Sequence, residues 1–521
     1  MRRETLAAVI MALAITHAGA HAAAAQTGAD DARLIAAARR FVPEVMRVYG
    51  VRGVEVAVAR HGTVIWEQGF GTANLAGSAP MTSATVFAAG SMSKTYTATA
   101  VMQLVEQGAL ALDAPINTYL RPGAGFEVVN PLGARDITVR DLLTHRSGLT
   151  SDAAGSELAI PAPLAAYLRA QYARPMLPSY SGASLPTWSA KVGEKFQYSN
   201  LGVATLGLLV QITNPEHSSF ADYVQRHIFG PLDMRHSEFP PLQDSAHLRP
   251  ELARHFARGY ARLGPVDLPS PQIYLADYPA GTLVTTAGDH IRLLLAYMNG
   301  GSYGGNRILQ PETVKLMLTE GPTSGMGLIW FLRDIGKPDF SFAHGGAYMF
   351  GWRNEFRAYP VLDLATVVAT NQWDMLSPHY GRAYSDVLDF LAEWVEHERD
   401  GARHPQLDHT WAWKCSYVVG LVWVDQIEGA LGTQTPLTAT DIDRAARSAR
   451  PLHTGAPDMW DEAGFRAGVY DMKHIALRPD SIRAFLKSDR LRVWPEELNL
   501  IYTALGAPAD WVPMPEFAPA H

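Results

Sequence analysis

The hydrophobic positions along the chain predict two groups of strands separated by a long, helix-rich middle section. Before the first group, apolar residues at helical spacing predict a helix over about residues 30–49. Val54–Ala59 and Thr63–Glu67 then predict two strands joined by a hairpin turn. The last group contains three candidate strands, Gly327–Phe331, Glu355–Tyr359 and Leu364–Thr370. A helix over Ser385–Glu398 closes this part of the chain.

Between the two groups, roughly residues 110–300 mix helical patterns with loops rich in Pro and Gly. Apolar helices are predicted at Leu201–Val210 and Ile291–Met298. Strands from both ends of the segment therefore flank a helix-rich middle. This pattern favours one sheet built from distant pieces, with a helical lobe inserted between them.

Length and composition indicate a large protein whose fold rests on its hydrophobic core. The 521 residues are 47% hydrophobic, which suggests more than one domain or lobe. Cys415 is the one cysteine, so an exported form has no internal disulfide. The net charge is −7, from 44 basic and 51 acidic residues, and no strongly basic patch stands out. We therefore expect no nucleic-acid partner.

The N-terminal residues have the pattern of a secretory signal peptide over residues 1–25. Arg2 and Arg3 form a charged start, Leu6–Ile15 form an apolar segment, and Ala23–Ala25 offer a small-residue cleavage site. An uncleaved anchor is the alternative, but the apolar run is shorter than a bilayer span. We expect a periplasmic or secreted protein with no stable membrane span after cleavage.

After the expected main domain, residues 26–400, the pattern changes. Glu396–His409 is charged and carries three histidines, but their spacing matches no standard metal site, so we interpret the stretch as a linker. Residues 401–521 form an extension that is mostly helical, with helices predicted at Asp441–Arg450, Met459–Met472, Ser481–Lys487 and Glu496–Ala504. We expect no metal and no other cofactor.

The run Phe87–Thr95 contains a candidate nucleophile. Ser91 and Lys94 are three residues apart at the start of a predicted helix that ends near Gly108, so hydroxyl and amine lie on one face. A serine needs a neighbouring base before it becomes a good nucleophile, and Ser-x-x-Lys supplies one. The alternative is that Ser91 caps the helix and Lys94 is solvated, because the pattern arises about once or twice by chance in such a chain.

Two further patterns supply the remaining parts of an acyl-transfer site. In Tyr198-Ser199-Asn200, the tyrosine can act as a base if a cation lowers its pKa, and the Asn can hold the lysine or a substrate amide. The alternative is a loop tyrosine before a buried helix. In the run from His344 to Ala347, Gly345 and Gly346 let a substrate approach backbone N–H groups that can bind an oxyanion.

His344 itself can add a hydrogen bond or positive character, although a glycine-rich turn with an incidental histidine is the alternative. Other copies of these short patterns occur in less suitable places. Tyr297-Met298-Asn299 ends an apolar helix and is interpreted as packing. His-x-Gly also occurs at His17, His379 and His453, away from strand signals. We therefore choose Tyr198 and His344.

The order Ser-x-x-Lys, Tyr-x-Asn, His-x-Gly closely resembles the serine β-lactamase and penicillin-binding-protein superfamily. It is most similar to the branch of class C β-lactamases, D-aminopeptidases and esterases. Four further segments resemble this family: Thr95–Gly108, Ile137–Leu149, Ile228–Met234 and Ala280–Asp289. The resemblance covers about residues 30–398. It implies an α+β fold, β-lactamase/DD-peptidase-like, with an antiparallel sheet flanked by helices and an inserted helical lobe.

The resemblance also implies roles for the site residues. Ser91 is acylated, Lys94 assists the proton transfer, and Tyr198 activates Ser91 and later a water. Asn200 orients the site. The backbone N–H groups of Ser91 and Ala347 form the oxyanion hole. His145 occupies the position of a loop histidine of the family, for which a structural role is expected.

Two departures narrow the expected function. Val192 stands where the family often has Pro, and His344-Gly345-Gly346 replaces the Lys-Thr-Gly of dedicated β-lactamases. The fixed cation for a β-lactam carboxylate is thus missing. We expect an exported serine hydrolase that cleaves an amide, peptide or ester bond of a small-molecule or peptide substrate. The alternatives are a carboxylesterase or β-lactamase of the same fold and, from another class, a non-catalytic penicillin-binding or sensor module.

A metal hydrolase is disfavoured, since the sequence has no His-Glu-x-x-His motif.

Overall fold

A computed structural model describes most of the chain up to residue 395. The described residues are 28–43, 45–46, 50–133, 135–150, 156–157, 163–178, 184–240, 247–263, 266–270, 274–348, 351–374, 384, 387–392, 394–395 and 464–466. They belong to two compact units, one of residues 50–388 and one of residues 1–49 with 389–521. The expected signal peptide, the stretch Glu396–His409 and most of the predicted C-terminal helices lie outside the described residues.

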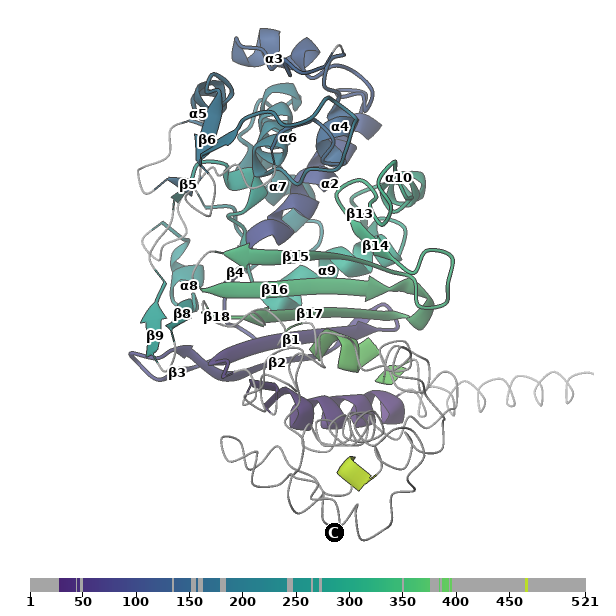
Figure 1. Cartoon of the computed structure of the whole chain (residues 1–521). Helices are drawn as coiled ribbons and strands as arrows, with labels where there is room; N and C mark the ends of the chain where they lie inside the picture. Colours follow the sequence, from purple (N-terminus) through teal and green to yellow (C-terminus); the bar gives the residue numbers. More distant parts are fainter. Residues whose placement is uncertain are drawn as a thin grey trace, which may run out of the picture. The chain divides into compact units, whose positions relative to one another are not determined.

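A seven-stranded antiparallel sheet forms the centre of the larger unit (Figure 1), which confirms the predicted fold class. Its strands, in spatial order, are β14 (Phe331–Arg333), β15 (Ser341–Tyr348), β16 (Trp352–Tyr359), β17 (Leu364–Thr370), β1 (Gly53–Arg60), β2 (Thr63–Asn74) and β3 (Ala79–Pro80). Strand β1 pairs with β17, from Val54 opposite Thr370 to Arg60 opposite Leu364. The prediction of one sheet built from distant pieces is therefore confirmed, because strands from the two ends of the segment pair at its centre.

The expected strands Val54–Ala59, Glu355–Tyr359 and Leu364–Thr370 are confirmed. The hairpin between β1 and β2 is also confirmed. It turns through His61 and Gly62, both in the left-handed region, with φ of 55° and 70°. Two left-handed residues match the twist of a tight hairpin. Strand β2 continues beyond the predicted Glu67 to Asn74.

The expected strand Gly327–Phe331 is wrong except for its last residue, which begins β14. Ile329 adopts a left-handed φ of 70°, and the Gly327 amide donates to the Trp330 carbonyl at 2.9 Å. The chain therefore makes a tight turn here. Ile329 and Trp330 are fully buried in that turn, so the apolar run reflects burial rather than extended backbone.

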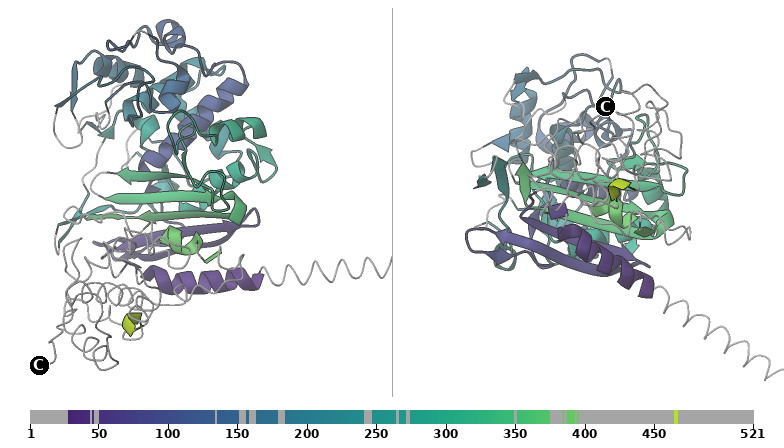
Figure 2. Two further views of the ribbon diagram at one scale, coloured as in Figure 1. Left: turned by 45° about the vertical axis from the view of Figure 1, so that its right-hand side comes forward. Right: turned by 60° about the horizontal axis from the view of Figure 1, so that its bottom comes forward.

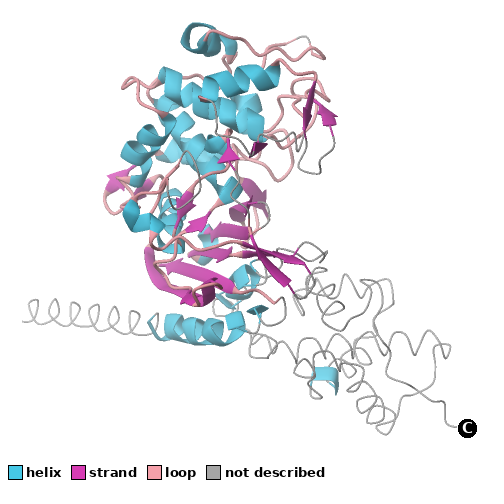
Figure 3. Ribbon diagram, turned by 90° about the vertical axis from the view of Figure 1, so that its left-hand side faces the viewer, coloured by secondary structure: helices cyan, strands magenta, loops and turns pink. Residues whose placement is uncertain are grey.

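Helices cover one face of the sheet and build the lobe beside it (Figures 1 and 3). Helix α9 (Ala287–Met298) packs against β1, β2, β16 and β17 and extends the predicted helix at its N-terminal end. The lobe contains α3 (Asn117–Ala124), α4 (Val139–Leu143), α5 (Leu164–Tyr172), α6 (Asn200–Thr213) and α7 (Phe220–Val224). Helices α3, α4, α5 and α7 pack on α6, and so does α2 (Ser93–Glu106). The inserted helical lobe is thereby confirmed, and both views of Figure 2 show it beside the sheet.

Short elements complete the larger unit. They are β4 (Phe87–Ala88), η1 (Gly90–Met92), β5 (Ser156–Glu157), β6 (Met176–Pro178), β7 (Ser184–Pro186), η2 (Gln225–Phe229), α8 (Pro250–Ala253), β8 (Tyr260–Leu263), β9 (Val266–Pro269), β10 (Tyr274–Leu275), η3 (Tyr278–Ala280), β11 (Val284–Thr285), β12 (Ser302–Tyr303), β13 (Asn306–Arg307), α10 (Pro311–Met317), η4 (Pro360–Leu362) and β18 (Gln372–Asp374).

The smaller unit includes a helix over residues 28–43 and 45–46, close to the predicted 30–49. Within this unit, the rings of Phe41 and Phe390 stack with centroids 4.1 Å apart. Residues 464–466, inside the expected helix Met459–Met472, are also helical. Within the described residues, no helix combines the length and apolar character needed to cross a bilayer.

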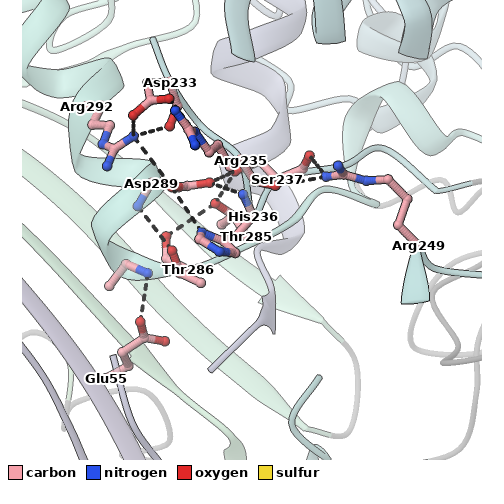
Figure 4. A network of polar contacts seen from close by, with 11 residues as sticks. Glu55, Asp233, Arg235, His236, Ser237, Arg249, Thr285, Thr286, Asp289 and Arg292 are labelled. Atoms are coloured by element: carbon pink, nitrogen blue, oxygen red, sulfur yellow. Dashed lines mark hydrogen bonds and ion pairs between the residues drawn. The ribbon is translucent and has the colours of Figure 1, made fainter. Parts of the chain in front are cut away.

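A polar network around Asp289 fixes the first turn of α9 (Figure 4). The Asp289 carboxylate accepts hydrogen bonds from the His236 amide at 2.5 Å and from Ser237 Oγ at 3.0 Å. Thr286 caps the helix by accepting from the Asp289 amide at 3.1 Å. Ser237 Oγ also lies 2.8 Å from Thr285 Oγ1 in β11, which pairs with β4 just before Ser91. The network therefore supports the segment that leads to the candidate nucleophile.

Replacing Asp289 by Asn should destabilise the protein by about 3 kcal/mol, because the variant places an amide against buried donors in place of a charged acceptor. Urea unfolding would measure the loss. Asp233→Asn is the matched control, since both Asp289 and Asp233 pair with Arg292, at 3.9 Å and 3.2 Å, but Asp233 is largely exposed. Asparagine also tolerates the left-handed φ of 54° at position 233. Equal losses of stability in the two variants would contradict the structural role assigned to the buried Asp289 carboxylate.

Candidate active site

Ser91 lies in the short 3-10 turn η1 that leads directly into α2. Two interactions of Ser93 hold this turn: its Oγ donates to the Gly90 carbonyl at 2.6 Å and accepts from the Leu283 amide at 3.0 Å. Gly90 has a left-handed φ of 58°, and a Cβ there would lie 2.6 Å from the Ala347 carbonyl oxygen. Glycine is thus required by both the backbone conformation and the close approach of β15.

Lys94 is fully buried in the first turn of α2, so the interpretation of a solvated lysine is wrong. Its Nζ donates to Ser91 Oγ at 2.9 Å and to the Ala280 carbonyl at 2.7 Å. Burial lowers the pKa of Lys94 to about 7, and the negative charge of Asp277 opposes this shift. Near neutral pH a substantial fraction of the amine is therefore uncharged and able to accept a proton.

Asp277 and the Ala280 carbonyl are site components that the motif search missed. Both lie at η3, which is held against α2 by a hydrogen bond from Thr97 Oγ1 to the Pro279 carbonyl at 2.6 Å. Burial raises the pKa of Asp277 to about 6, while Lys94 acts in the opposite direction. Asp277 and Lys94 are 183 positions apart in the sequence. The similarity of Ala280–Asp289 to a family segment was the one sequence signal near them.

Tyr198 and Asn200 flank the start of α6. Ser199 is the N-cap of this helix and accepts from the Gly202 amide at 3.0 Å, so Asn200 becomes the first helical residue. The cap holds Tyr198 just outside the helix, where Lys94 Nζ lies 4.9 Å from the centroid of the tyrosine ring. The structure thus brings Tyr198 together with the Ser91–Lys94 pair and places Asn200 two residues away on α6.

His344, Gly345, Gly346 and Ala347 lie on β15, next to the turn that carries Ser91. A Cβ at Gly346 would lie only 1.9 Å from the Ala89 carbonyl oxygen, so this strand docks on the turn through a bare backbone. From the neighbouring β16, Asn354 Nδ2 donates to the Ala88 carbonyl at 2.8 Å. The Ala347 backbone therefore lies beside the Gly90–Ser91 segment, as the expected oxyanion hole requires.

His344 is neutral near pH 7. It is 2% exposed, and burial together with the charge of Lys94 lowers its pKa to about 3. Its Nδ1 lies 2.7 Å from the Gly345 carbonyl, to which it donates, and this leaves Nε2 as an acceptor. Of the two expected contributions, the positive character is therefore wrong, and the capacity for a hydrogen bond remains.

The rejected copies of the motifs lie elsewhere or outside the described residues. Tyr297 is buried in α9, where its hydroxyl lies 2.8 Å from Thr99 Oγ1, as expected of a packing residue. His17, His379 and His453 lie outside the described residues. Across the part of the chain that the structure describes, no three His, Cys, Asp or Glu side chains gather as a metal site would require.

The fold and the motif geometry define a β-lactamase-like protein, and comparisons with known proteins agree. The model of the Beta-lactamase family matches residues 38–388. Protein Rv1367c of Mycobacterium tuberculosis is 28% identical over 321 residues, which cover 55% of this chain and 77% of the relative. The chain belongs to the beta-lactamase family, within the serine β-lactamase and penicillin-binding-protein superfamily that its motifs resemble.

Two solved structures share the fold. One is the D-amino acid amidase from Ochrobactrum anthropi SV3 in complex with L-phenylalanine amide, with a TM-score of 0.52 and 21% identity. The other is EstCE1, described as a hydrolase with promiscuous acyltransferase activity, with a TM-score of 0.54 and 21% identity. Each alignment covers 70% of this chain and 99% of the other.

Gly346→Ala should disturb the docking of β15 on the nucleophile turn, because its Cβ would overlap the Ala89 carbonyl. We expect a loss of about 1–3 kcal/mol in the free energy of unfolding, measured by urea unfolding. Gly345→Ala is the control, since its Cβ meets the Asn354 carbonyl at an ordinary 3.7 Å. A Gly346→Ala variant as stable as Gly345→Ala would refute the steric requirement.

Proposed function

We propose that the protein is a serine hydrolase that cleaves an amide, peptide or ester bond through an acyl-enzyme on Ser91. The observation that carries this proposal is the contact between Ser91 Oγ and Lys94 Nζ at 2.9 Å, combined with a lysine pKa of about 7. A base with a pKa near the working pH is both available and strong enough to take the hydroxyl proton.

In the proposed acylation step, Ser91 Oγ forms a bond to the substrate carbonyl carbon as its proton passes to the Lys94–Tyr198 pair. The carbonyl oxygen becomes an oxyanion and is bound by the backbone N–H groups of Ser91 and Ala347. When the bond to the leaving group breaks, the departing amine or alcohol takes that proton. Tyr198 then activates a water, which attacks the ester carbonyl and restores the Ser91 hydroxyl.

The neutral state of His344 supports an amide or ester substrate rather than a β-lactam. A β-lactam carries a carboxylate, and a fixed cation in the third motif would bind it. His344 is uncharged near pH 7 and offers an acceptor in its place. The two structural neighbours, an amidase and a hydrolase with acyltransferase activity, are in keeping with acyl chemistry on this fold.

The proposal includes export to the periplasm or outside the cell, directed by residues 1–25. It also includes a hydrolase domain over residues 26–400, an extension over residues 401–521, and Asn200 and His344 as groups that orient the substrate.

A parallel turnover screen of nitrophenyl esters, nitrocefin, and L- and D-amino-acid amides would identify the substrate class. Slow acylation without release on every substrate would favour the non-catalytic binding or sensor module.

Ser91→Ala should abolish turnover of the best substrate and covalent labelling by a fluorophosphonate, because the variant has no atom to acylate. Intact-protein mass spectrometry would measure the labelling. Ser83→Ala serves as control: it removes an exposed hydroxyl in a turn before the same segment, outside the proposed chemistry, so labelling at Ser91 should persist. Full activity of Ser91→Ala would end the proposal.

The pH dependence of kcat/KM should follow the protonation of the buried Lys94. With a Lys94 pKa of about 7, kcat/KM should fall about tenfold per pH unit below that value, as the amine becomes protonated. Asp277→Asn should move this acidic limb to lower pH, because the negative charge of Asp277 raises the lysine pKa.

The control for this profile is Asp113→Asn, at an exposed carboxylate that pairs with Arg140. It should leave the limb in place. A limb that stays fixed or moves to higher pH in Asp277→Asn would contradict the assignment of the limb to Lys94.

A further inference from the structure

We infer that His145, which belongs to none of the three motifs, is a positioning residue that holds Tyr198 against Lys94. This inference rests on the proposed function, in which Tyr198 takes part in proton transfer. It gives the loop histidine a role in the rate of the reaction, whereas the sequence favoured a structural role.

His145 binds both backbone amides that flank Tyr198. Its carbonyl accepts from the Gln197 amide at 2.7 Å, and its side-chain Nδ1 accepts from the Ser199 amide at 3.2 Å. A single residue therefore holds the 196–197 peptide unit before the tyrosine and the 198–199 peptide unit directly after it. Since Ser199 is also the N-cap of α6, the same contact sets where that helix begins.

The ring of His145 also packs against the ring of Tyr198. The imidazole of His145 lies 4.5 Å from the Tyr198 ring between centroids, at an interplanar angle of 40°. Its other neighbour is Phe196, whose ring meets it edge-on at 5.7 Å. Lys94 Nζ lies 4.9 Å from the centroid of the Tyr198 ring. Backbone hydrogen bonds and ring packing from His145 thus act on the same side chain that approaches Lys94.

The charge state of His145 suits this role. The residue is 1% exposed, and burial, with Lys94 and His344 nearby, holds its pKa well below the ordinary range. Accepting from Ser199 requires an unprotonated Nδ1, so the ring proton lies on Nε2. A protonated ring would lose the hydrogen bond and would add a second positive charge close to Lys94. His145 therefore positions Tyr198 only as the neutral imidazole.

The backbone of His145 allows a matched pair of variants. Its φ of 53° lies in the left-handed region, which glycine and asparagine both tolerate. In His145→Asn, the carboxamide oxygen can take the place of Nδ1 as acceptor for the Ser199 amide. In His145→Gly, that acceptor is lost while the backbone conformation remains accessible. A difference between the two variants therefore reports the loss of the side chain and its hydrogen bond rather than backbone strain.

We expect His145→Gly to lower kcat about 10- to 100-fold on the substrate found in the screen, with KM changed less than about threefold. A displacement of a catalytic group by about 1 Å is enough for such a loss. His145→Asn should recover at least about fivefold of this kcat. In the Tyr198→Phe background, His145→Gly should cost less than about threefold, because the residue acts through the tyrosine. Equal kcat values for the Gly and Asn variants, or a full loss in the Tyr198→Phe background, would overturn the inference.

Amide hydrogen exchange separates this inference from the proposed function. The Ser199 amide should exchange slowly in the wild type and in His145→Asn, and at least about tenfold faster in His145→Gly. Unchanged exchange in His145→Gly would overturn the inference whatever the activity. Absence of Ser91-dependent turnover in the wild type would instead refute the proposed function, and a rise in Ser199 exchange would then still support the hold on the 197–199 segment.

Discussion

The site depends on keeping the amine of Lys94 out of water. A buried amine must find hydrogen-bond acceptors inside the protein, and its charged form is penalised by desolvation. Ser91 Oγ and the Ala280 carbonyl supply the acceptors, and Asp277 limits the fall in the pKa. These partners come from two segments distant in sequence, so α2 and η3 must dock before the lysine acquires its properties. The docking of α6 and β15 then adds Tyr198 and His344 around the same point.

Those parts of this arrangement that depend on neighbouring residues in the chain could be predicted from the sequence. The spacing of Ser91 and Lys94 places both on one turn, and short segments rich in Val and Ala identify β1 and β17. The strand predicted at Gly327–Phe331 was wrong because a buried turn and a buried strand have the same apolar composition. Asp277 and the double contact of His145 could not be predicted, since each depends on how distant segments dock rather than on any short pattern.

Burial also determines the electrostatics of the site in a way that residue identity does not. His145 and His344 would each be partly charged near neutral pH if exposed, yet desolvation keeps both imidazoles neutral. Their tautomers differ: Nδ1 accepts in His145 and donates in His344. The same residue type therefore holds a backbone segment in one place and, in the other, supplies an acceptor within the third motif.

The pairing of β1 with β17 has a consequence for the order in which the protein is synthesised and folds. Residues 54–60 form half of the sheet's centre, but their partners, residues 364–370, are made more than three hundred residues later. Strand β15, which docks against the Ser91 turn, is also a late product of synthesis. A nascent chain that has already exposed Ser91 thus lacks the sheet and the strand that complete its surroundings. The surroundings of Ser91 are therefore complete only after nearly the whole of the larger unit has been synthesised.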